Sequence, residues 1–394
     1  MRRDRKGSRQ LFRRLFEISL LAIVLLAGCS AGGLRTETIV IADSETEPPA
    51  QSEGEPFEAE IYYKPMFTMN EKYVGPFRWS GENEMVRLSV GNKMVATVDR
   101  LTPPYEETKE ILDLSSFLVD YSGLSPNGRY YAGFIMESND NKLPIMIVDL
   151  KNGGRQNIEN GEVSSYRMGT TTLSWSDNSR YLSYLYRDQS DKLSINVYDI
   201  EQQKLTGYKL ADHYEQEFYY AIKLSEDGSS AVLIKEYGGE PAGFELGKLA
   251  DGQFVSEYKH TLNPSLGVVW LDQDRIAFVG TDGTLFCYDR RNDSVYVLLD
   301  QVSGFALSAD KQYIAYSTEE ATIDVAKLQG NNLLHKSTVY HTFVASEMGW
   351  SPNNGSLFVL GRKPYEEMIA PEPEAKVKYS SEIFSRQLIV IDFK

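Results

Sequence analysis

Short apolar runs and polar turns alternate along most of this chain. In residues 123–134 the turn Ser-Pro-Asn-Gly, at positions 125–128, separates two apolar runs that are each long enough for one strand. Proline presets the backbone for a turn, and Asn-Gly tolerates the positive φ that a tight turn needs. No helical spacing of apolar residues competes in this window, so the pattern predicts β-hairpins.

The same pattern recurs as a repeat. Six further segments follow it, at residues 88–96, 175–183, 224–228, 270–277, 307–315 and 350–355, the copy at 270–277 with one residue deleted. The third strand of each unit carries Asp113, Asp149, Asp199, Asp289 or Asp392, with Lys248 and Lys327 in the two other units. Six steps between Leu88 and Trp350 average about 44 residues each, which is the length of a four-stranded propeller blade.

We therefore predict an all-β fold, a β-propeller over residues 57–394. Seven four-stranded blades fit the repeat best, within a range of six to eight, and such units close into a ring because none buries its faces alone. The last copy supplies three strands before the chain ends. Residues 58–64 or residues 76–80 should therefore complete the last blade and remove its open edge. We expect no appended catalytic domain.

The turn Trp/Leu-Ser-Pro-Asp/Asn-Gly, followed by a Tyr/Val-Asp-Leu strand, resembles the repeat of TolB-type propellers. It resembles more distantly the WD-repeat class and the propeller that precedes prolyl-peptidase domains. The resemblance covers roughly residues 60–394. The resemblance implies the propeller fold. TolB-like propellers in general are envelope platforms that bind proteins. Four copies have degenerate turns and no partner-binding tail is recognisable, so a Tol-system role is not implied.

The N-terminus has the order of a secretory signal peptide. Residues 1–16 are basic, residues 18–26 are apolar but too short to span a membrane, and small residues precede Cys29. The sequence Leu26-Ala27-Gly28-Cys29 resembles the lipobox of bacterial lipoproteins. That resemblance implies cleavage between Gly28 and Cys29, with residues 1–28 as the signal peptide and lipid (palmitate-type acyl chains) on the Cys29 thiol. The alternative is a soluble secreted protein cut nearby.

Two acyl chains would hold the protein stably on the membrane. We therefore expect a lipid-anchored protein on the extracytoplasmic face of a bacterial cell membrane. Residues 29–56 contain Cys29 and an acidic, proline-containing stretch without an apolar pattern. Such a stretch cannot bury enough surface to fold, so it should form a disordered tether between lipid and propeller.

The charge of the chain limits its partners. The net charge is −15, and because residues 1–28 carry a net +5, the remaining chain carries −20. A strongly acidic chain is unsuited to binding nucleic acid through phosphates. It suits basic partners or cations, or reflects solubility alone. Of the two cysteines, Cys287 lies in a predicted strand and should be a buried free thiol. We expect a monomer.

Acidic and aromatic residues are predicted to gather on one rim of the ring. The motif Pro-Tyr-Glu-Glu occurs at residues 104–107 in the first unit and at 364–367 in the last, and these units become neighbours on ring closure. We hypothesise that this rim binds a basic or cationic partner; the alternative is that these loops are acidic only because they are solvated. The residues of this hypothesis are Tyr105, Glu106, Glu107, Tyr365, Glu366 and Glu367.

No sequence motif predicts catalysis. The chain has only four histidines, no Gly-x-Ser-x-Gly motif, no phosphate-binding glycine loop and no zinc-spaced histidine pair. The acidic stretch around His213 lacks the ligand spacing of a metal site, so we expect no metal and no cofactor. The favoured function is a platform that binds a protein or envelope component. The alternatives are an enzyme acting on a glycan or peptide in a central funnel, and a ligand sensor for a membrane partner.

Overall fold

The computed structural model describes residues 39–40, 57–65, 71–91, 95–118, 120, 122–136, 142–164, 173–188, 190, 192–210, 217–237, 241–318, 321–363 and 386–394. The chain divides between Ile39 and Val40 into two units, and the second contains strands β2 to β29. Strand β1 (Ile39–Val40) lies at this boundary. None of these residues forms a helix long and apolar enough to cross a membrane.

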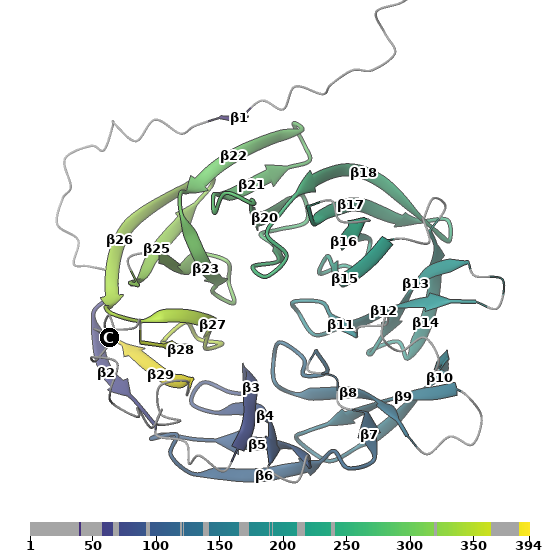
Figure 1. Ribbon diagram of the computed structural model, residues 1–394, viewed down its shortest axis with the longest axis horizontal. Helices are drawn as coiled ribbons and strands as arrows, with labels where there is room; N and C mark the ends of the chain where they lie inside the picture. Colours follow the sequence, from purple (N-terminus) through teal and green to yellow (C-terminus); the bar gives the residue numbers. More distant parts are fainter. Residues whose placement is uncertain are drawn as a thin grey trace, which may run out of the picture. The chain divides into compact units, whose positions relative to one another are not determined.

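The described strands form seven antiparallel groups of four, arranged as a ring (Figure 1). The first blade contains β3 (Glu71–Trp79), β4 (Met85–Gly91), β5 (Ala96–Leu101) and β6 (Thr108–Asp113). The second contains β7 (Phe117–Leu118), β8 (Tyr130–Ile135), β9 (Lys142–Asp149) and β10 (Arg155–Ser164). The third contains β11 (Ser174–Trp175), β12 (Tyr181–Arg187), β13 (Leu193–Asp199) and β14 (Lys204–Lys209).

The remaining blades repeat this order from the inner strand outwards. The fourth contains β15 (Glu217–Leu224), β16 (Ser230–Tyr237), β17 (Gly243–Ala250) and β18 (Gln253–Thr261). The fifth contains β19 (Val268–Trp270), β20 (Arg275–Val279), β21 (Leu285–Asp289) and β22 (Ser294–Leu299). The sixth contains β23 (Val302–Leu307), β24 (Tyr313–Thr318), β25 (Ile323–Gln329) and β26 (Asn332–Tyr340). The seventh contains β27 (Val344–Trp350), β28 (Ser356–Arg362), β29 (Gln387–Phe393) and β2 (Ala59–Tyr63).

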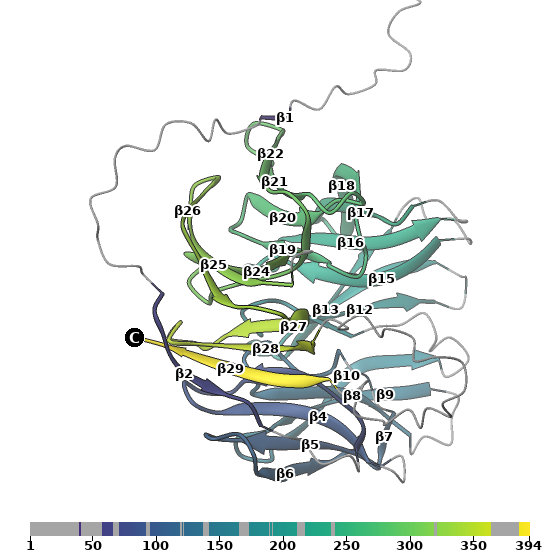
Figure 2. The ribbon, with the colours of Figure 1, turned by 60° about the vertical axis from the view of Figure 1, so that its left-hand side comes forward.

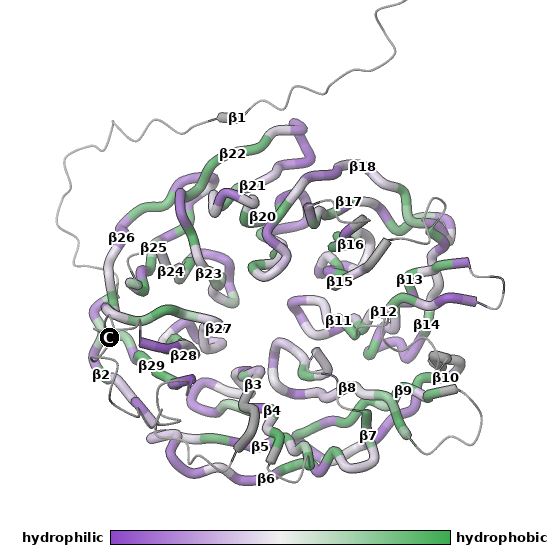
Figure 3. The backbone as a smooth tube through the Cα atoms, viewed as in Figure 1, coloured by the Kyte–Doolittle hydropathy of each residue, from purple (hydrophilic) through white to green (hydrophobic). Residues whose placement is uncertain are grey.

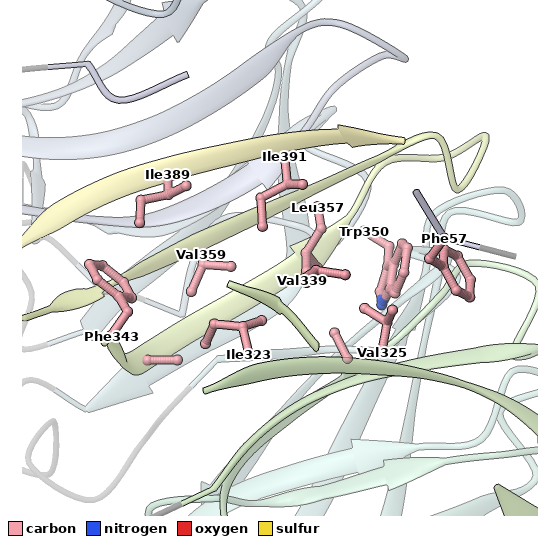
Figure 4. Close-up of a cluster of buried hydrophobic side chains, with 12 residues drawn as sticks. Phe57, Ile323, Val325, Val339, Phe343, Trp350, Leu357, Val359, Ile389 and Ile391 are labelled. Carbon is pink, nitrogen blue, oxygen red and sulfur yellow. The ribbon is translucent and has the colours of Figure 1, made fainter. Parts of the chain in front are cut away.

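The predicted all-β propeller is confirmed, including its closure by an N-terminal strand. Strand β2 pairs antiparallel with β29, and the Lys394 amide donates to the Glu58 carbonyl at 3.0 Å (Figure 2). Phe57, just before β2, is 6% exposed, and its ring packs against Trp350 (Figure 4) and against Tyr313, between blades six and seven. The closing strand is therefore held by ladder hydrogen bonds and by a buried aromatic anchor.

The phase of the first repeat was predicted wrongly. Residues 88–96 run from the second strand of blade one into the third, and Asp113 ends the fourth strand rather than the third. The true first turn follows Trp79, where the Ser80 amide donates to the Glu84 carbonyl at 2.8 Å. This turn lacks the Ser-x-Asx pattern, and in an all-β repeat a slip by one strand leaves the apolar periodicity almost unchanged. Residues 76–80 therefore belong to the first blade and not to the closing one.

The serine of the turn repeat is a buried hydrogen-bonding residue. In blade two, Ser125 Oγ donates to Asn127 Oδ1 at 2.8 Å and accepts from the Tyr130 amide at 2.9 Å. The same pair of bonds recurs at Ser176, Ser225, Ser308 and Ser351. Gly128 has φ 63°, and a Cβ there would lie 2.8 Å from the Trp79 carbonyl oxygen of the neighbouring blade. The turn chemistry thus also sets how closely blades approach each other.

Burial falls from the middle of each blade to its outer strand. In the second strand of blade seven, β28, only the last residue is exposed, whereas in β6, the outer strand of blade one, only Leu112 is buried. Hydrophobic segments accordingly follow the middle strands, while many turns are hydrophilic (Figure 3). The core is therefore a series of apolar layers between neighbouring blades.

All four tryptophans join neighbouring blades near the ring centre. Each ends or nearly ends a first strand, and its indole N–H donates to a carbonyl of the first-strand segment in the preceding blade. The pairs are Trp79 to Gly349, Trp175 to Gly123, Trp270 to Lys223 and Trp350 to Ala306, at 2.8 to 3.2 Å. The equivalent positions in blades two, four and six hold leucine, so the tryptophans occupy the odd-numbered blades.

Candidate binding site on the ring axis

The structure places the first Pro-Tyr-Glu-Glu motif in the connection from the third strand β5 to the fourth strand β6, and not between second and third strands as predicted. The first repeat was placed one strand out of phase, so this connection lies at the other end of its blade from the one expected. Tyr365, Glu366 and Glu367 of the second motif lie outside the described residues, so a rim shared by the two motifs stays a prediction.

Tyr105 is a packing residue in this structure. It is 1% exposed, and its ring meets Trp79 and Tyr63 edge-on. Burial, and secondarily the negative charge of Asp392, raises the pKa of the Tyr105 hydroxyl well above its usual range. Glu106 and Glu107 are exposed, so a role for them in binding stays a prediction.

The end of the ring that carries Glu106 and Glu107 is acidic. We call it the turn rim, because it holds the turns between first and second strands of every blade and, in blades one to six, those between third and fourth strands. Exposed acids occur in eight of the described connections of this kind, and they include Glu106, Glu107, Glu201, Glu226, Asp227 and Asp251. A surface of this kind attracts a partner with a basic face.

An ion pair crosses the ring at the turn rim. Lys311 lies in the first turn of blade six and Asp177 in the first turn of blade three, and Lys311 Nζ is 3.1 Å from Asp177 Oδ2. Two blades separate them on one side of the ring and three on the other. Residues of such distant blades approach each other only at the axis, so this pair bridges the central passage.

Two further basic residues occupy equivalent positions in first strands, which line the ring centre. Arg78 and Lys223 each stand one residue before the Trp or Leu that ends a first strand. The same position in the other five blades holds Gly123, Ser174, Val269, Ala306 and Gly349. Arg78 of blade one forms an ion pair with Glu347 of blade seven. The remaining cation, Lys223, lies in blade four.

The pKa of Lys223 is lowered by its surroundings. Removal of the amine from water is the largest cause, and the positive charges of Arg78 and Lys311 act in the same direction. The negative charge of Asp177 opposes them without cancelling them. Mutual influence between residues of blades one, three, four and six places all of them at the axis. No hydrogen bond or ion pair of the Lys223 amine occurs within the described part of the chain.

The sequence contained a signal for this cluster that the motif search missed. Lys311 occupies the turn position where the organising repeat has Gly128, and it has φ 60°, a conformation that favours glycine. The signal consists of Lys311 at a glycine position and of Arg78 and Lys223 at a position that is otherwise small or apolar. These are the basic residues of the cluster at the axis. Turn motifs alone do not carry this signal, because it emerges only from equivalent positions of the seven blades.

The described residues show neither a metal site nor a reactive cysteine. Among the residues that the structure describes, no three His, Cys, Asp or Glu side chains are placed to hold a metal ion. Asp212, His213 and Glu215 fall outside the described ranges. Cys287 is a buried free thiol, as predicted, and burial raises its pKa to about 12. Such a thiol is unreactive at neutral pH.

Comparisons with known proteins support the fold. No protein-family model and no curated protein matches the chain in sequence. The chain is similar to a chain of a mitotic checkpoint complex, with a TM-score of 0.51 and 13% identity over 90% of this chain and 98% of that one. It is also similar to the β-propeller domain of the trilobed protease from Pyrococcus furiosus, with a TM-score of 0.49 and 13% identity over 76% and 91% of the two chains.

A third similar structure is a prolyl endopeptidase, with a TM-score of 0.49 and 14% identity over 74% of this chain. The match spans 46% of the prolyl endopeptidase chain. At such identities a structural likeness shows the fold alone. The chain is a β-propeller, and its function has to be argued from its own residues.

Proposed function

We propose that this protein is a membrane-anchored extracytoplasmic platform whose propeller binds a protein or an envelope component. The observation that carries the proposal is the Lys311–Asp177 ion pair across the ring. An enzyme that works in a propeller funnel needs an open passage with catalytic groups in it. The Lys311–Asp177 pair bridges the passage at the turn rim, so a large partner would bind on a rim, whereas only a small molecule could enter the ring.

The turn rim is the docking surface in this proposal. Its exposed carboxylates, Glu106 and Glu107 among them, favour a partner with a basic face. Fixed turns suit this task, because little conformational entropy is lost when a rigid surface binds. The buried serine bonds and the interlocked turns of neighbouring blades supply that rigidity.

The anchor follows from the N-terminal segment. Cleavage before Cys29, lipid on its thiol and a tether to residue 56 would place the propeller on the extracytoplasmic face of a bacterial membrane. The expected form is a monomer, since the ring closes on itself through β2 and β29. Release of the protein into the soluble fraction by Cys29→Ala tests this part.

Crosslinking and capture from membranes tests the platform. The charge reversals Glu106→Lys/Glu107→Lys on the turn rim and Glu366→Lys/Glu367→Lys in the second Pro-Tyr-Glu-Glu motif are compared with wild type. The matched control is Glu110→Lys/Glu159→Lys, which makes the same charge change on exposed positions of the outer strands β6 and β10. We expect a reproducible envelope partner that only the turn-rim variant loses.

Other outcomes separate the alternatives. Loss of the partner in the Glu366→Lys/Glu367→Lys variant alone would move the docking surface to the segment between β28 and β29. Equal capture by all variants would contradict electrostatic docking. If well-anchored wild type captures no protein, polymer screens follow, and binding or cleavage of a glycan would replace the platform.

A further inference from the structure

The charges on the axis do not balance. Lys311 is paired with Asp177 and Arg78 with Glu347, which leaves the ammonium group of Lys223 as the uncompensated charge of the cluster. This excess positive charge lies inside a chain with a net charge of −15. Lys223 is partly buried, and its ammonium group lies near the cations of Arg78 and Lys311 without a paired anion of its own.

Lys223 is held in place by its backbone. It pairs with Val232 in the β15–β16 ladder, and its carbonyl accepts the Trp270 indole N–H at 3.1 Å. Ile222 and Leu224 on either side are buried to 1% exposure in the apolar layer between blades. The lysine therefore cannot leave the axis by a shift of its strand.

The enclosed ammonium group costs stability. Taking an ammonium group from water without a paired anion is unfavourable, whereas an unbranched apolar side chain of similar length would pack without that cost. Lys223 is thus a residue that the fold tolerates rather than requires. Such residues are typical of functional sites.

Solvent reaches the cluster. The side chains of Arg78, Glu347, Lys311 and Asp177 remain 31%, 24%, 20% and 27% exposed. Each of these side chains therefore borders a solvent-accessible space. An anion in that space would meet one unpaired ammonium group and two cations already engaged with carboxylates.

We propose that Lys223 binds a single anionic group, a carboxylate or a phosphate, on a ligand that enters the ring along its axis. The ammonium group donates charge-assisted hydrogen bonds to the ligand oxygens, and Arg78 and Lys311 add attraction at longer range. Asp177 and Glu347 neutralise those two cations, so the site suits one negative charge and disfavours a polyanion. This site goes beyond the rim platform and does not depend on it.

The test uses the purified full-length chain and small anions. Sodium phosphate, sodium acetate, trialanine and trialanine amide are titrated at an ionic strength held constant with sodium chloride. The chain has four tryptophans, so its NMR spectrum has four indole N–H signals, and the Trp270→Phe variant identifies the one bonded to Lys223. Binding is followed by that signal and by the melting temperature.

We expect at least one anion to shift the Trp270 signal saturably and raise the melting temperature. Lys223→Met should weaken this binding roughly tenfold or more, because a charge-assisted hydrogen bond is lost. Lys223→Arg should retain it. The control Lys204→Met, which changes an exposed lysine of the outer strand β14, should bind like wild type.

Preference for phosphate would identify a phosphorylated ligand, and preference for trialanine over its amide would identify a carboxylate. The proposal is overturned if no anion gives a saturable shift in wild type. It is also overturned if Lys223→Met binds the anion as tightly as wild type does. Neither result depends on capture of a protein at the turn rim, so the two proposals fail separately.

Discussion

The indole N–H of Trp79 donates to the carbonyl oxygen of Gly349 at 2.8 Å, joining the first blade to the last at the ring centre. At the outside of the ring the same closure is made by β2 on β29. Because seven is odd, the alternation of tryptophan and leucine around the ring brings two tryptophan blades together at this seam. The closing interface therefore has a hydrogen bond near the axis and a paired strand at the edge.

Replacing this tryptophan should loosen the seam. Trp79→Phe keeps an aromatic ring but leaves the Gly349 carbonyl without its donor, so we expect a loss of about 1–3 kcal/mol in the free energy of unfolding. Urea denaturation measures the change. Trp350→Phe, which removes a longer bond of 3.2 Å, is the comparison and should cost no more. A Trp79→Phe variant as stable as wild type would show that the bond contributes nothing to closure.

The aromatic anchor of the closing strand should matter more than the strand's exposed face. Phe57→Ala removes a buried ring packed against Tyr313, Trp350 and Phe393, and we expect a loss of about 3 kcal/mol. Ile61→Ala, on the same segment but 42% exposed, should change stability by less than about 0.5 kcal/mol. Thermal and urea unfolding of both variants test the contrast, and similar losses would contradict it.

Lys223 gives the stability a pH dependence of known sign. Its pKa is lowered in the folded protein, so between that value and the ordinary lysine pKa the unfolded state binds more protons than the folded state. Stability therefore rises with pH across this window, and the cost of the buried charge is fully present below it. Lys223→Met should be more stable than wild type near pH 7 and lack this part of the slope.

Urea midpoints at several pH values between 7 and 10 measure the effect of Lys223, with Lys204→Met as the exposed control. A Lys223→Met variant less stable than wild type at neutral pH would mean that the ammonium group stabilises the ring.

The residue at position 311 combines backbone strain with a cross-ring contact. Lys311 has φ 60°, which costs roughly 1 kcal/mol for a residue with a Cβ. Lys311→Ala keeps this cost and loses the ion pair with Asp177, whereas Lys311→Gly loses the pair and the strain. We expect the glycine variant to be about 1 kcal/mol more stable than the alanine variant by urea denaturation. Equal stabilities would show that the surrounding turn, and not the side chain, sets this conformation.

Sequence patterns predicted the strands well because strands and turns are determined by residues close together in the sequence. A strand is detected from its own residues, and the serine turn is built from hydrogen bonds within six positions, as between Ser125 and Tyr130. The repeat length then predicted the blades, and a missing fourth strand predicted closure by residues 58–64. The error in the first unit came from the one junction, after Trp79, where the turn residues differ.

The candidate site could not be found in this way. Tyr105 and Glu107 looked equivalent in the sequence, yet one is buried against Trp79 and the other is exposed. Which rim a connection occupies depends on strand order within the blade, so a shift of one strand moved residues 104–107 to the opposite end.

The sequence by itself determined the all-β repeat, the turn chemistry and the likeness of residues 26–29 to a lipobox. Tertiary structure alone decided which residues meet at the axis. Asp177 and Lys311 are 134 positions apart, and Arg78 and Glu347 are 269 apart. Contacts between such distant positions arise only when the ring closes, because closure fixes the direction in which each first strand faces the axis. The unpaired charge of Lys223 is a product of that geometry.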